Sequence, residues 1–475
     1  MSNYKPGTWI ALFIGAHFAH HLLTALVVPL LPYIRDGFEL SYAQAGIVVS
    51  AFTLSYGFAQ LPAGWLADRV GRARLITVGI AGVAAAGAVA GVTTSYWGLI
   101  AALILMGIAG GGYHPSASPL ITASVPPERK GRALGLHLVG GSASHFATPL
   151  LGAAIASQFG FHGAFLGISL PVLLFGIAFF LILRSRGEQR WSAGSSDAAA
   201  SIDARGEQSD AGPGATPGGD AQVDSAASEG AARGSEARHA GPALPAGATE
   251  SAARAPAADA RPDTAAGESG RRTIVRISVF LFMTSIVGAV IASVTAFMPL
   301  YLVDAFGLSE GLAAGALSLF YATGVVAAPA GGMLSDRFGP VPILVGLSVA
   351  TGPLLMLAAR VPAASLFVLI LVVIGVGQFF RMPVSESYLS HDVPDRLRST
   401  VLGVYFFAGM EASGLLTPIL GGLIDAWGFT RAFMLAGVAL TVLATVSAAM
   451  LYRMHAADAP VSEAMSTREA APDRR

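Results

Sequence analysis

Six of the ten histidines in this 475-residue sequence lie within long apolar stretches of its first half. They are His17, His20, His21, His114, His137 and His145. The first three are spaced i, i+3 and i+4, so a helix places them on one face. Because imidazole titrates at about pH 6.5, such a cluster suits a carrier of protons. The alternative is that these side chains pack between helices, bonded to the backbone or to Ser and Thr.

The same spacing, with further histidines across a cavity, is also typical of transition-metal ligands. The sequence has no cysteine and no methionine-rich run, and the middle of the histidine-bearing stretches holds no Asp or Glu. We therefore predict neither a metal site nor a cofactor, and keep a metal or metal chelate as an alternative ligand.

The composition indicates what surrounds these residues. Hydrophobic residues make up 53% of the chain and charged residues only 12%. A water-soluble fold of this size cannot bury so much apolar surface, so we predict a multi-pass protein of the lipid bilayer. The lack of cysteine excludes disulfides, zinc–thiolate sites and cysteine nucleophiles. Equal numbers of basic and acidic residues, 29 of each, argue against nucleic acid as a partner.

Twelve apolar stretches are each long enough to cross about 30 Å of hydrocarbon as a helix. They lie near residues 8–33, 42–66, 74–93, 97–123, 131–157, 163–183, 274–303, 311–335, 341–359, 363–389, 399–425 and 431–452. We predict an all-α membrane protein with twelve transmembrane helices in two pseudo-symmetric six-helix bundles, 1–185 and 273–453. Residues 186–272 contain almost no large apolar side chains, so we predict a disordered linker there and a terminal tail at 454–475.

Basic residues gather in the loops that follow even-numbered stretches. Those loops hold Arg69, Arg72, Arg74, Arg129, Lys130, Arg132, Arg184, Arg186, Arg337, Arg396 and Arg398. Odd-numbered loops hold only Arg35, Arg360 and Arg431. By the positive-inside rule, both termini and the linker are predicted to be cytoplasmic. No small-residue cleavage site follows the first apolar run, which we predict to be a retained helix rather than a signal peptide.

The two sets of six stretches are related by a single sequence offset. When the sequence is aligned with itself at an offset of 268 residues, Asp68 aligns with Asp336, and Pro115 aligns with Pro383. The same offset holds from the second stretch to the twelfth, which predicts a duplicated six-helix unit. Because six is even, both copies enter the membrane from the same side, and the repeat is parallel.

The most similar segments of the repeat read GWLADRVGR at 64–72 and GMLSDRFGP at 332–340. They resemble the signature cytoplasmic loop of the major facilitator superfamily, which implies a secondary transporter gated there. The gating residues so implied are Gly64, Asp68, Arg69, Gly71, Arg72, Gly332, Asp336, Arg337 and Gly339. Gly64 is expected to let a neighbouring helix approach, and Gly71 to permit a tight turn. The alternative is that the arginines only set the topology.

A finer resemblance is to the fosmidomycin-resistance branch of that superfamily. It is carried by His17 twelve residues before the PLLP run at 29–32, and by the pair His114-Pro115. It implies proton-driven export of a small toxic compound. The chain departs from the branch at His21, where an Asp is frequent, and from drug/proton antiporters at Leu103, where an Arg is usual. Helix-bending and close-packing positions are predicted at Pro115, Gly140, Gly141, Pro149 and Pro383.

Three ionisable residues of the second half lie within apolar stretches, where charge is costly and marks function by default. They are Arg381, Glu386 and Glu411. Glu411 falls about 18 Å along its helix, near the midplane, where a carboxyl can exchange a proton or bind a cation. Arg381 is predicted to bind an anionic group or to hold Glu386, unless it lies near the membrane surface. A neutral Glu411 bonded across helices is the structural alternative.

The predicted function is secondary transport across a bacterial inner membrane by alternating access, with proton-coupled export of a small toxic compound or metabolite. One alternative is uptake of a small organic anion, and another is a non-transporting sensor or scaffold. We expect a monomer whose partners are a small-molecule substrate and protons. Nucleotide-loop and hydrolase motifs are absent from the sequence, so we predict that the protein is not an enzyme.

Overall fold

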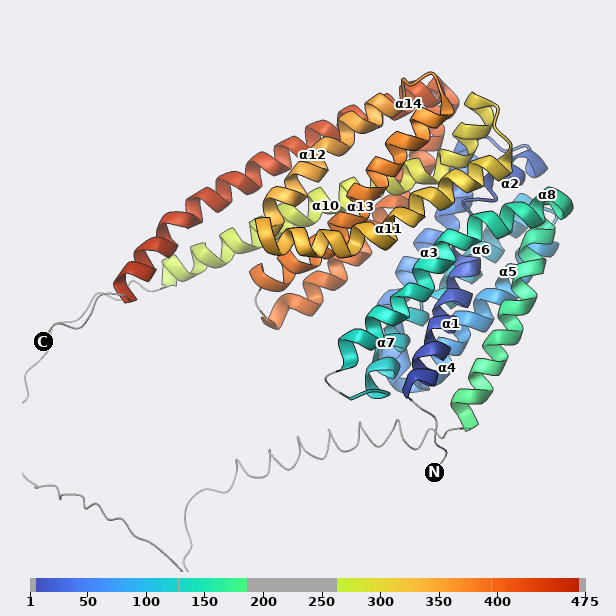
Figure 1. Ribbon diagram of the computed structural model, residues 1–475, viewed down its shortest axis with the longest axis horizontal. Coiled ribbons are helices and arrows are strands. Elements are labelled where there is room, and N and C mark those ends of the chain that lie inside the picture. The colour runs from blue at the N-terminus through green and yellow to red at the C-terminus, as the bar shows by residue number, and fades with distance from the viewer. Residues whose placement is uncertain (1–5, 127–128, 186–262, 394, 470–475) are drawn as a thin grey trace, which may run out of the picture. The chain divides into compact units, whose positions relative to one another are not determined.

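The computed structural model describes residues 6–126, 129–185, 263–393 and 395–469. Within these ranges the chain is almost entirely helical and contains no strand (Figure 1). Nine helices of the described residues are long and apolar enough to cross a membrane. Most of the linker predicted at 186–272 lies outside the described residues.

The helices have the following bounds. In the first half they are α1 (Pro6–Thr24), α2 (Leu31–Phe38), α3 (Tyr42–Val70), α4 (Arg72–Thr77), the π-helical turn η1 (Val78–Gly82), α5 (Val83–Val92), α6 (Tyr96–Gly110), α7 (Tyr113–Ala123) and α8 (Lys130–Ser185). In the second half they are α10 (Asp263–Phe306), α11 (Glu310–Phe338), α12 (Pro340–Ala358), α13 (Ala364–Asp392) and α14 (Asp395–Glu469).

These bounds differ from the predicted stretches at four places. The stretch at 8–33 is two helices, α1 and α2, because Pro29 and Pro32 cannot donate backbone hydrogen bonds to a continuing helix. The stretch at 97–123 is divided between α6 and α7 at consecutive glycines. At the other two places helix extends further than predicted, since α10 begins within the predicted linker and α14 continues into the predicted tail.

Glycine breaks divide the two longest helices. The 56 residues of α8 would extend about 84 Å if straight, nearly three times the hydrocarbon thickness. Gly160 leaves the helical conformation at φ 66° and ψ 179°, and Gly428 does the same in α14 at φ 76° and ψ 167°. Glycine adopts these angles without a Cβ clash, so each long helix is two membrane-length segments joined at a corner.

The backbone repeats the offset found in the sequence. Positive φ angles among the described residues fall at Glu39, Gly71, Gly160, Gly307, Gly339 and Gly428. These six residues form three pairs, each 268 positions apart, and each pair occupies equivalent corners of the two halves. Duplicated backbone geometry at these corners supports the duplicated unit inferred from the sequence.

The first and second halves pack together through small residues of α3 and α14. A Cβ on Gly46 would lie 2.7 Å from the backbone Cα of Pro418, so only glycine permits this approach. Four residues further along α3, the Ser50 hydroxyl donates a 2.5 Å hydrogen bond to the carbonyl of Gly414. Close backbone approach at small residues is the usual way in which membrane helices associate.

Candidate functional site

All six membrane-embedded histidines of the first half gather at one place, on α1, α7 and α8. We call them the histidine cluster: His17, His20, His21, His114, His137 and His145. The ring centroid of His17 lies 4.8 Å from that of His21 and 5.3 Å from that of His114. The ring of His145 lies 4.6 Å from that of His21. The sequence placed three of these residues on one face, and the structure adds the other three.

Two members of the histidine cluster are held by hydrogen bonds to neighbouring helices. His20 contacts the carbonyl of Gly79 through Nδ1 at 2.7 Å and the Tyr56 hydroxyl through Nε2 at 3.2 Å. His137 contacts the carbonyl of Phe13 through Nδ1, and its ring stacks on that of His17 at 4.2 Å. His20 therefore corresponds to the structural alternative, bonded between helices.

Two consecutive glycines on α8 allow this helix to pack closely against α1 at the histidine cluster. A Cβ on Gly140 would overlap the carbonyl of Ile14, and one on Gly141 would lie 2.6 Å from the imidazole of His17. These two glycines therefore bring α8 against α1. Of the predicted bending positions, Pro115 lies in the first turn of α7, while Pro149 and Pro383 lie inside α8 and α13.

Glu411 on α14 faces α3 at the contact between the halves. Its side chain is 8% exposed, and neither carboxylate oxygen has a hydrogen-bond partner among the described residues. A Cβ on Gly57 would overlap its Oε1, so the missing side chain at Gly57 makes room for the acid. Tyr56, the next residue of α3, contacts His20. Glu411 and the histidine cluster therefore contact adjacent residues in the same turn of α3.

Arg381 on α13 is 5% exposed, which places it inside the protein. Its guanidinium donates to the carbonyl of Thr284 on α10 and, at 2.7 Å, to Oε1 of Gln378. Its Nε has no partner among the described residues. Glu386 lies one turn further along α13 and is partly buried.

The predicted gating loops share one geometry. Gly71 ends α3 at φ 96°, and Gly339 ends α11 at φ 78°. Asp68 pairs with Arg72 at 2.9 Å, and Arg69 lies over the Trp65 ring at 4.0 Å. Contrary to the expected helix approach, a Cβ on Gly64 would meet nothing within 4 Å in this conformation, and the same holds for Gly332. Arg337 lies over the Phe338 ring, while the side chain of Asp336 lies outside the described residues.

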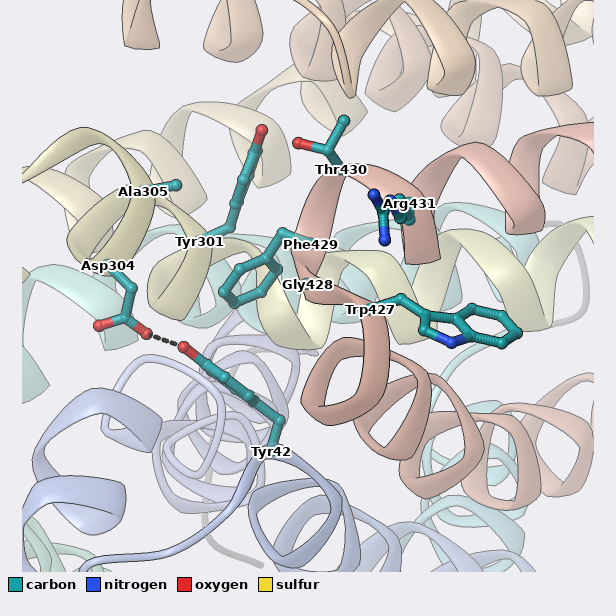
Figure 2. A pocket seen from close by; sticks show the side chains of 9 residues that line it. All are labelled: Tyr42, Tyr301, Asp304, Ala305, Trp427, Gly428, Phe429, Thr430 and Arg431. Atoms are coloured by element: carbon teal, nitrogen blue, oxygen red, sulfur yellow. Dashed lines mark hydrogen bonds between the residues drawn. The ribbon is translucent and has the colours of Figure 1, made fainter.

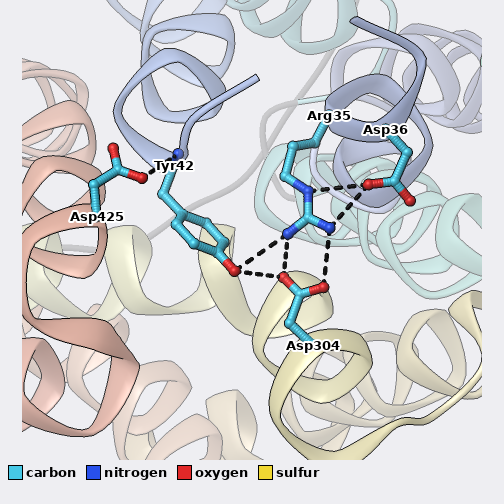
Figure 3. A network of polar contacts seen from close by, with 5 residues as sticks. All are labelled: Arg35, Asp36, Tyr42, Asp304 and Asp425. Carbon is cyan, nitrogen blue, oxygen red and sulfur yellow. Dashed lines mark hydrogen bonds and ion pairs between the residues drawn. The ribbon is translucent and has the colours of Figure 1, made fainter. Parts of the chain in front are cut away.

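A polar network that the sequence analysis missed joins the halves at the opposite end of α3. We call it the Arg35 network: Arg35, Asp36, Tyr42, Asp304 and Asp425 (Figure 3). Arg35 pairs with Asp304 of α10 and with Asp36 at 2.8 Å. The Tyr42 hydroxyl donates to Asp304 at 2.8 Å. The sequence contains one signal of this network, because Asp36 and Asp304 stand 268 residues apart, which is the offset of the repeat.

Asp425 of α14 holds the first turn of α3. The backbone N–H of Tyr42 donates to its carboxylate at 2.8 Å (Figure 3). The backbone N–H of Ala43 donates to the same carboxylate at 2.8 Å. A carboxylate at a helix N-terminus satisfies donors that no helical carbonyl reaches, and it interacts favourably with the helix dipole. Burial alone would lower the pKa of Arg35, but the bonds and charges of Asp304 and Asp36 raise it above its ordinary value. Arg35 therefore keeps its positive charge at every physiological pH.

A cavity of about 500 Å³ lies beside the Arg35 network (Figure 2). Its lining comes from Tyr42 on α3, from the end of α10 including Tyr301 and Asp304, and from 427–431 around the Gly428 corner. The volume is in the range of pockets that hold small molecules, and the lining combines aromatic rings with Asp304 and Arg431. The cavity lies at the joined end of the halves, away from the predicted gating loops.

The described helices define an integral membrane protein built from membrane-length helices and containing no sheet within the described residues. A comparison with known protein families matches the Major Facilitator Superfamily over residues 13–411 and 280–471. The chain belongs to this superfamily, as its duplicated loop indicated. The family is one of membrane transporters, so the prediction that the protein is not an enzyme is confirmed.

Several curated relatives are multidrug transporters. The chain is 33% identical over 169 residues to the multi-drug resistance efflux pump PmrA of Streptococcus pneumoniae, which covers 34% of this chain and 41% of the pump. It is 31% identical over 182 residues to the multidrug resistance protein MdtG of Salmonella arizonae, covering 37% of this chain and 43% of that protein. The chain thus matches less than half the length of these relatives.

Solved transporters share the fold over nearly the whole chain. A bacterial homologue of the human lysosomal transporter Spinster, in an inward-facing and occupied conformation, superposes with a TM-score of 0.66 and 16% identity, covering 95% of this chain and 98% of that one. A mutant of the peptide transporter POT in complex with sulfate gives a TM-score of 0.68, 15% identity and 95% coverage of both chains. At these identities the likeness concerns the fold alone.

Proposed function

We propose that this protein exports a small toxic compound or metabolite across a bacterial inner membrane, driven by protons. The observation that carries the proposal is a carboxyl, Glu411, buried without a hydrogen-bond partner among the described residues at the contact between the halves. An ionisable group at such a place in a transporter marks a substrate or proton path. The partial similarity to PmrA and MdtG supports export of toxic compounds. The finer likeness to fosmidomycin-resistance proteins stays a prediction.

The proposed topology has twelve transmembrane helices, with both termini and the 186–272 linker in the cytoplasm. The nine membrane-length helices become eleven when α8 and α14 are divided at Gly160 and Gly428, and α1 is the twelfth. The distribution of arginine and lysine supports this orientation. In it the Arg35 network is periplasmic and the Asp68 loop cytoplasmic.

The proposed mechanism is rocking of the two halves about a central site. In the proposed topology the Arg35 network closes the periplasmic side, so the mechanism treats the described conformation as inward-facing. Opening outward separates α3 from α14 and breaks the network, and the Asp68 and Asp336 loops then close the cytoplasmic side. This motion moves Gly57 away from Glu411 and gives the carboxyl access to water, so protons can exchange there and at His17, His21 and His114.

The first experiment is drug susceptibility of an efflux-deficient bacterial host that expresses this chain. The panel contains fosmidomycin, other phosphonates, cationic dyes and metal salts. We expect raised resistance to at least one compound, lost in Asp68→Asn. Increased sensitivity to a phosphonate or a metal salt would show uptake instead of export.

Proton coupling is tested separately, in proteoliposomes with a substrate from that panel. Glu411→Gln keeps the size of the side chain and removes its charge, so pH-driven transport should fall by about two orders of magnitude if the acid carries the proton. Glu39→Gln is the matched control, because Glu39 is an exposed acid outside the apolar stretches and should leave pH-driven transport unchanged. Unchanged pH-driven transport in Glu411→Gln would remove this residue from the coupling mechanism.

Uptake of a small organic anion is the second candidate, and the burial of Arg381 favours it. Its Nε has no partner among the described residues, so a carboxylate or phosphate could bond there. An arginine that only supports α10 would not contact the substrate, so its substitution would not affect one substrate more than another. Arg381→Lys separates the two roles, because it should weaken anion uptake while leaving export of a cationic dye unchanged.

A further inference from the structure

Three histidines from two helices point ligand atoms at one another. His17 and His21 of α1 and His114 of α7 each offer one imidazole nitrogen, and these three atoms lie within 4.8 Å of one another. Two of the residues are one helical turn apart, and the third comes from a separate helix. Such convergence is the geometry by which proteins hold a transition metal.

The hydrogen bond of His17 leaves a free lone pair. Its Nδ1 lies 2.9 Å from the carbonyl oxygen of His137, and a carbonyl can only accept, so Nδ1 carries the proton. The neutral ring then has an unprotonated Nε2. This atom is buried without a partner among the described residues, on a side chain that is only 3% exposed. A buried acceptor without a donor is costly unless a ligand occupies it.

His145 on α8 repeats this arrangement beside His21. Its Nδ1 lies 2.9 Å from the carbonyl of Gly141, so its Nε2 also carries a lone pair. Metal-bound histidines commonly donate their second nitrogen to a backbone carbonyl, which fixes the tautomer and the ring orientation. His17 and His145 both have this outer bond before any metal binds.

The other members of the histidine cluster act as support. Both nitrogens of His20 are engaged, with Gly79 and Tyr56, so His20 has no lone pair to offer. His137 supplies the carbonyl that orients His17 and stacks against its ring. The six histidines thus divide into ligands and residues that position the ligands.

The chemistry of the donors selects the ion. Neutral imidazoles suit borderline divalent ions such as Zn²⁺, Cu²⁺, Ni²⁺ and Co²⁺, whereas Mg²⁺ and Ca²⁺ require oxygen ligands. Bonds of about 2.0–2.1 Å place the nitrogens of a tetrahedral site roughly 3.4 Å apart. Binding an ion therefore requires the three nitrogens, which lie within 4.8 Å of one another, to move closer together.

We propose that His17, His21 and His114 bind a borderline divalent transition-metal ion of the Zn²⁺ class, with His145 completing the site. The sequence alone left this ligand as an alternative, because the chain has no cysteine and no methionine-rich run, and the middle of the histidine-bearing stretches holds no Asp or Glu. The inference is independent of the proposed export, since binding is measured without flux.

The experiment uses the full-length protein without a histidine tag, purified in detergent, and titrates it with Co²⁺ and Zn²⁺. We expect one equivalent of Co²⁺ to produce visible d–d absorption, which one equivalent of Zn²⁺ then removes. His114→Asn should weaken binding by about a hundredfold, and the positioning variant His20→Gln by about tenfold. His162→Asn is the matched control, because His162 contacts the carbonyl of Thr93 outside the histidine cluster and should leave the affinity unchanged.

Two measurements keep the result clear if a variant folds poorly. Thermal unfolding without metal shows whether His114→Asn is intact, and X-ray absorption of the unmodified protein with Zn²⁺ reports its ligands directly. A shell of three or four imidazole nitrogens is expected. A shell dominated by oxygen, no saturable binding of one equivalent, or equal weakening in His162→Asn would overturn the proposal, as would binding of a phosphonate that needs His114 without any metal binding.

Discussion

The two ends of α3 differ in what their charged residues contact. At the Tyr42 end, carboxylates of α10 and α14 bond directly to α3, so the second half holds its first turn. At the Val70 end, Asp68 pairs with Arg72 of its own loop, and both side chains are well exposed. The same helix is therefore joined across the halves at one end, while the charges of its other end are paired locally.

The packing of α3 against α14 also changes from the Tyr42 end to the Val70 end. Gly46 and Ser50 contact the backbone of α14 closely, and Gly57 makes room for Glu411. Beyond this point Leu61 and Trp65 are largely exposed. The Gly57–Glu411 contact lies between the joined end and the free end of α3.

The largest expected effect comes from forcing the joined end apart. In Gly46→Val the added atoms meet the backbone of Pro418, which cannot move aside, so the joined conformation should lose about 1–3 kcal/mol, a shift of roughly 5–150-fold in population. Spin labels on cysteines introduced at Glu39 and Leu308 measure the separation, since the chain has no cysteine of its own.

Gly315→Val is the control for this change. It makes the same substitution inside another membrane helix, α11, where a Cβ would meet nothing within 4 Å, so the joined conformation should keep its population. Equal label separations in the two variants would show that the effect does not arise from the contact of Gly46 with Pro418.

A smaller effect is expected from removing the charge that joins α2 to α10. Arg35→Ala leaves the carboxylates of Asp304 and Asp36 without their cation, which should cost the joined conformation about 1.5 kcal/mol, or roughly tenfold in population. The same spin-label pair reports the change. Arg360→Ala removes an exposed arginine of another odd-numbered loop and should leave the separation as it was.

Tyr42→Phe should have a still smaller effect, because it keeps the ring and the ion pair of Arg35 and removes only the hydroxyl, which donates to Asp304 and accepts from Arg35 at 3.3 Å. The lost bond to Asp304 is worth about 0.5–1.5 kcal/mol to the joined conformation. Tyr96→Phe is the control, since its hydroxyl contacts the carbonyl of Gln44 within the first half. A population change in Tyr96→Phe as large as in Tyr42→Phe would show that the effect does not arise between the halves.

The smallest expected effect comes from a corner at which the two halves have different residues. Glu39 adopts φ 51°, whereas its equivalent in the second half is Gly307 at φ 65°. Glu39→Gly removes the Cβ strain but adds chain entropy in the unfolded state, so we expect a net gain of only about 0.5 kcal/mol. Thermal unfolding in detergent measures it, and Gly307→Ala should shift the midpoint in the opposite direction.

Much of the fold could be predicted from the sequence because hydropathy and the repeat are local or periodic signals. Apolar length located the membrane helices, and the 268-residue offset located equivalent corners such as Gly71 and Gly339. Helix ends were less certain, since prolines and glycines inside an apolar run interrupt the backbone without changing hydropathy, as between α1 and α2.

The candidate site was predictable only where its residues share a helix. The spacing of His17 and His21 showed a common face, but their approach to His114 depends on how α1 and α7 pack. Likewise, the ionisable character of Glu411 was visible, while the space that Gly57 leaves for it belongs to the other half. Contacts between the halves, including the Arg35 network, have no local sequence signature.

The Arg35 network also makes the conformational balance sensitive to salt. The side chains of Arg35 and Asp304 remain 18% and 20% exposed, so dissolved ions reach the pair and screen part of its attraction. The contacts of Gly46 and Ser50 with α14, by contrast, involve no net charge. In the proposed topology, a low salt concentration outside the cell therefore stabilises the closed periplasmic side more than a high salt concentration does. The external ionic strength then regulates how often the transporter opens on that side.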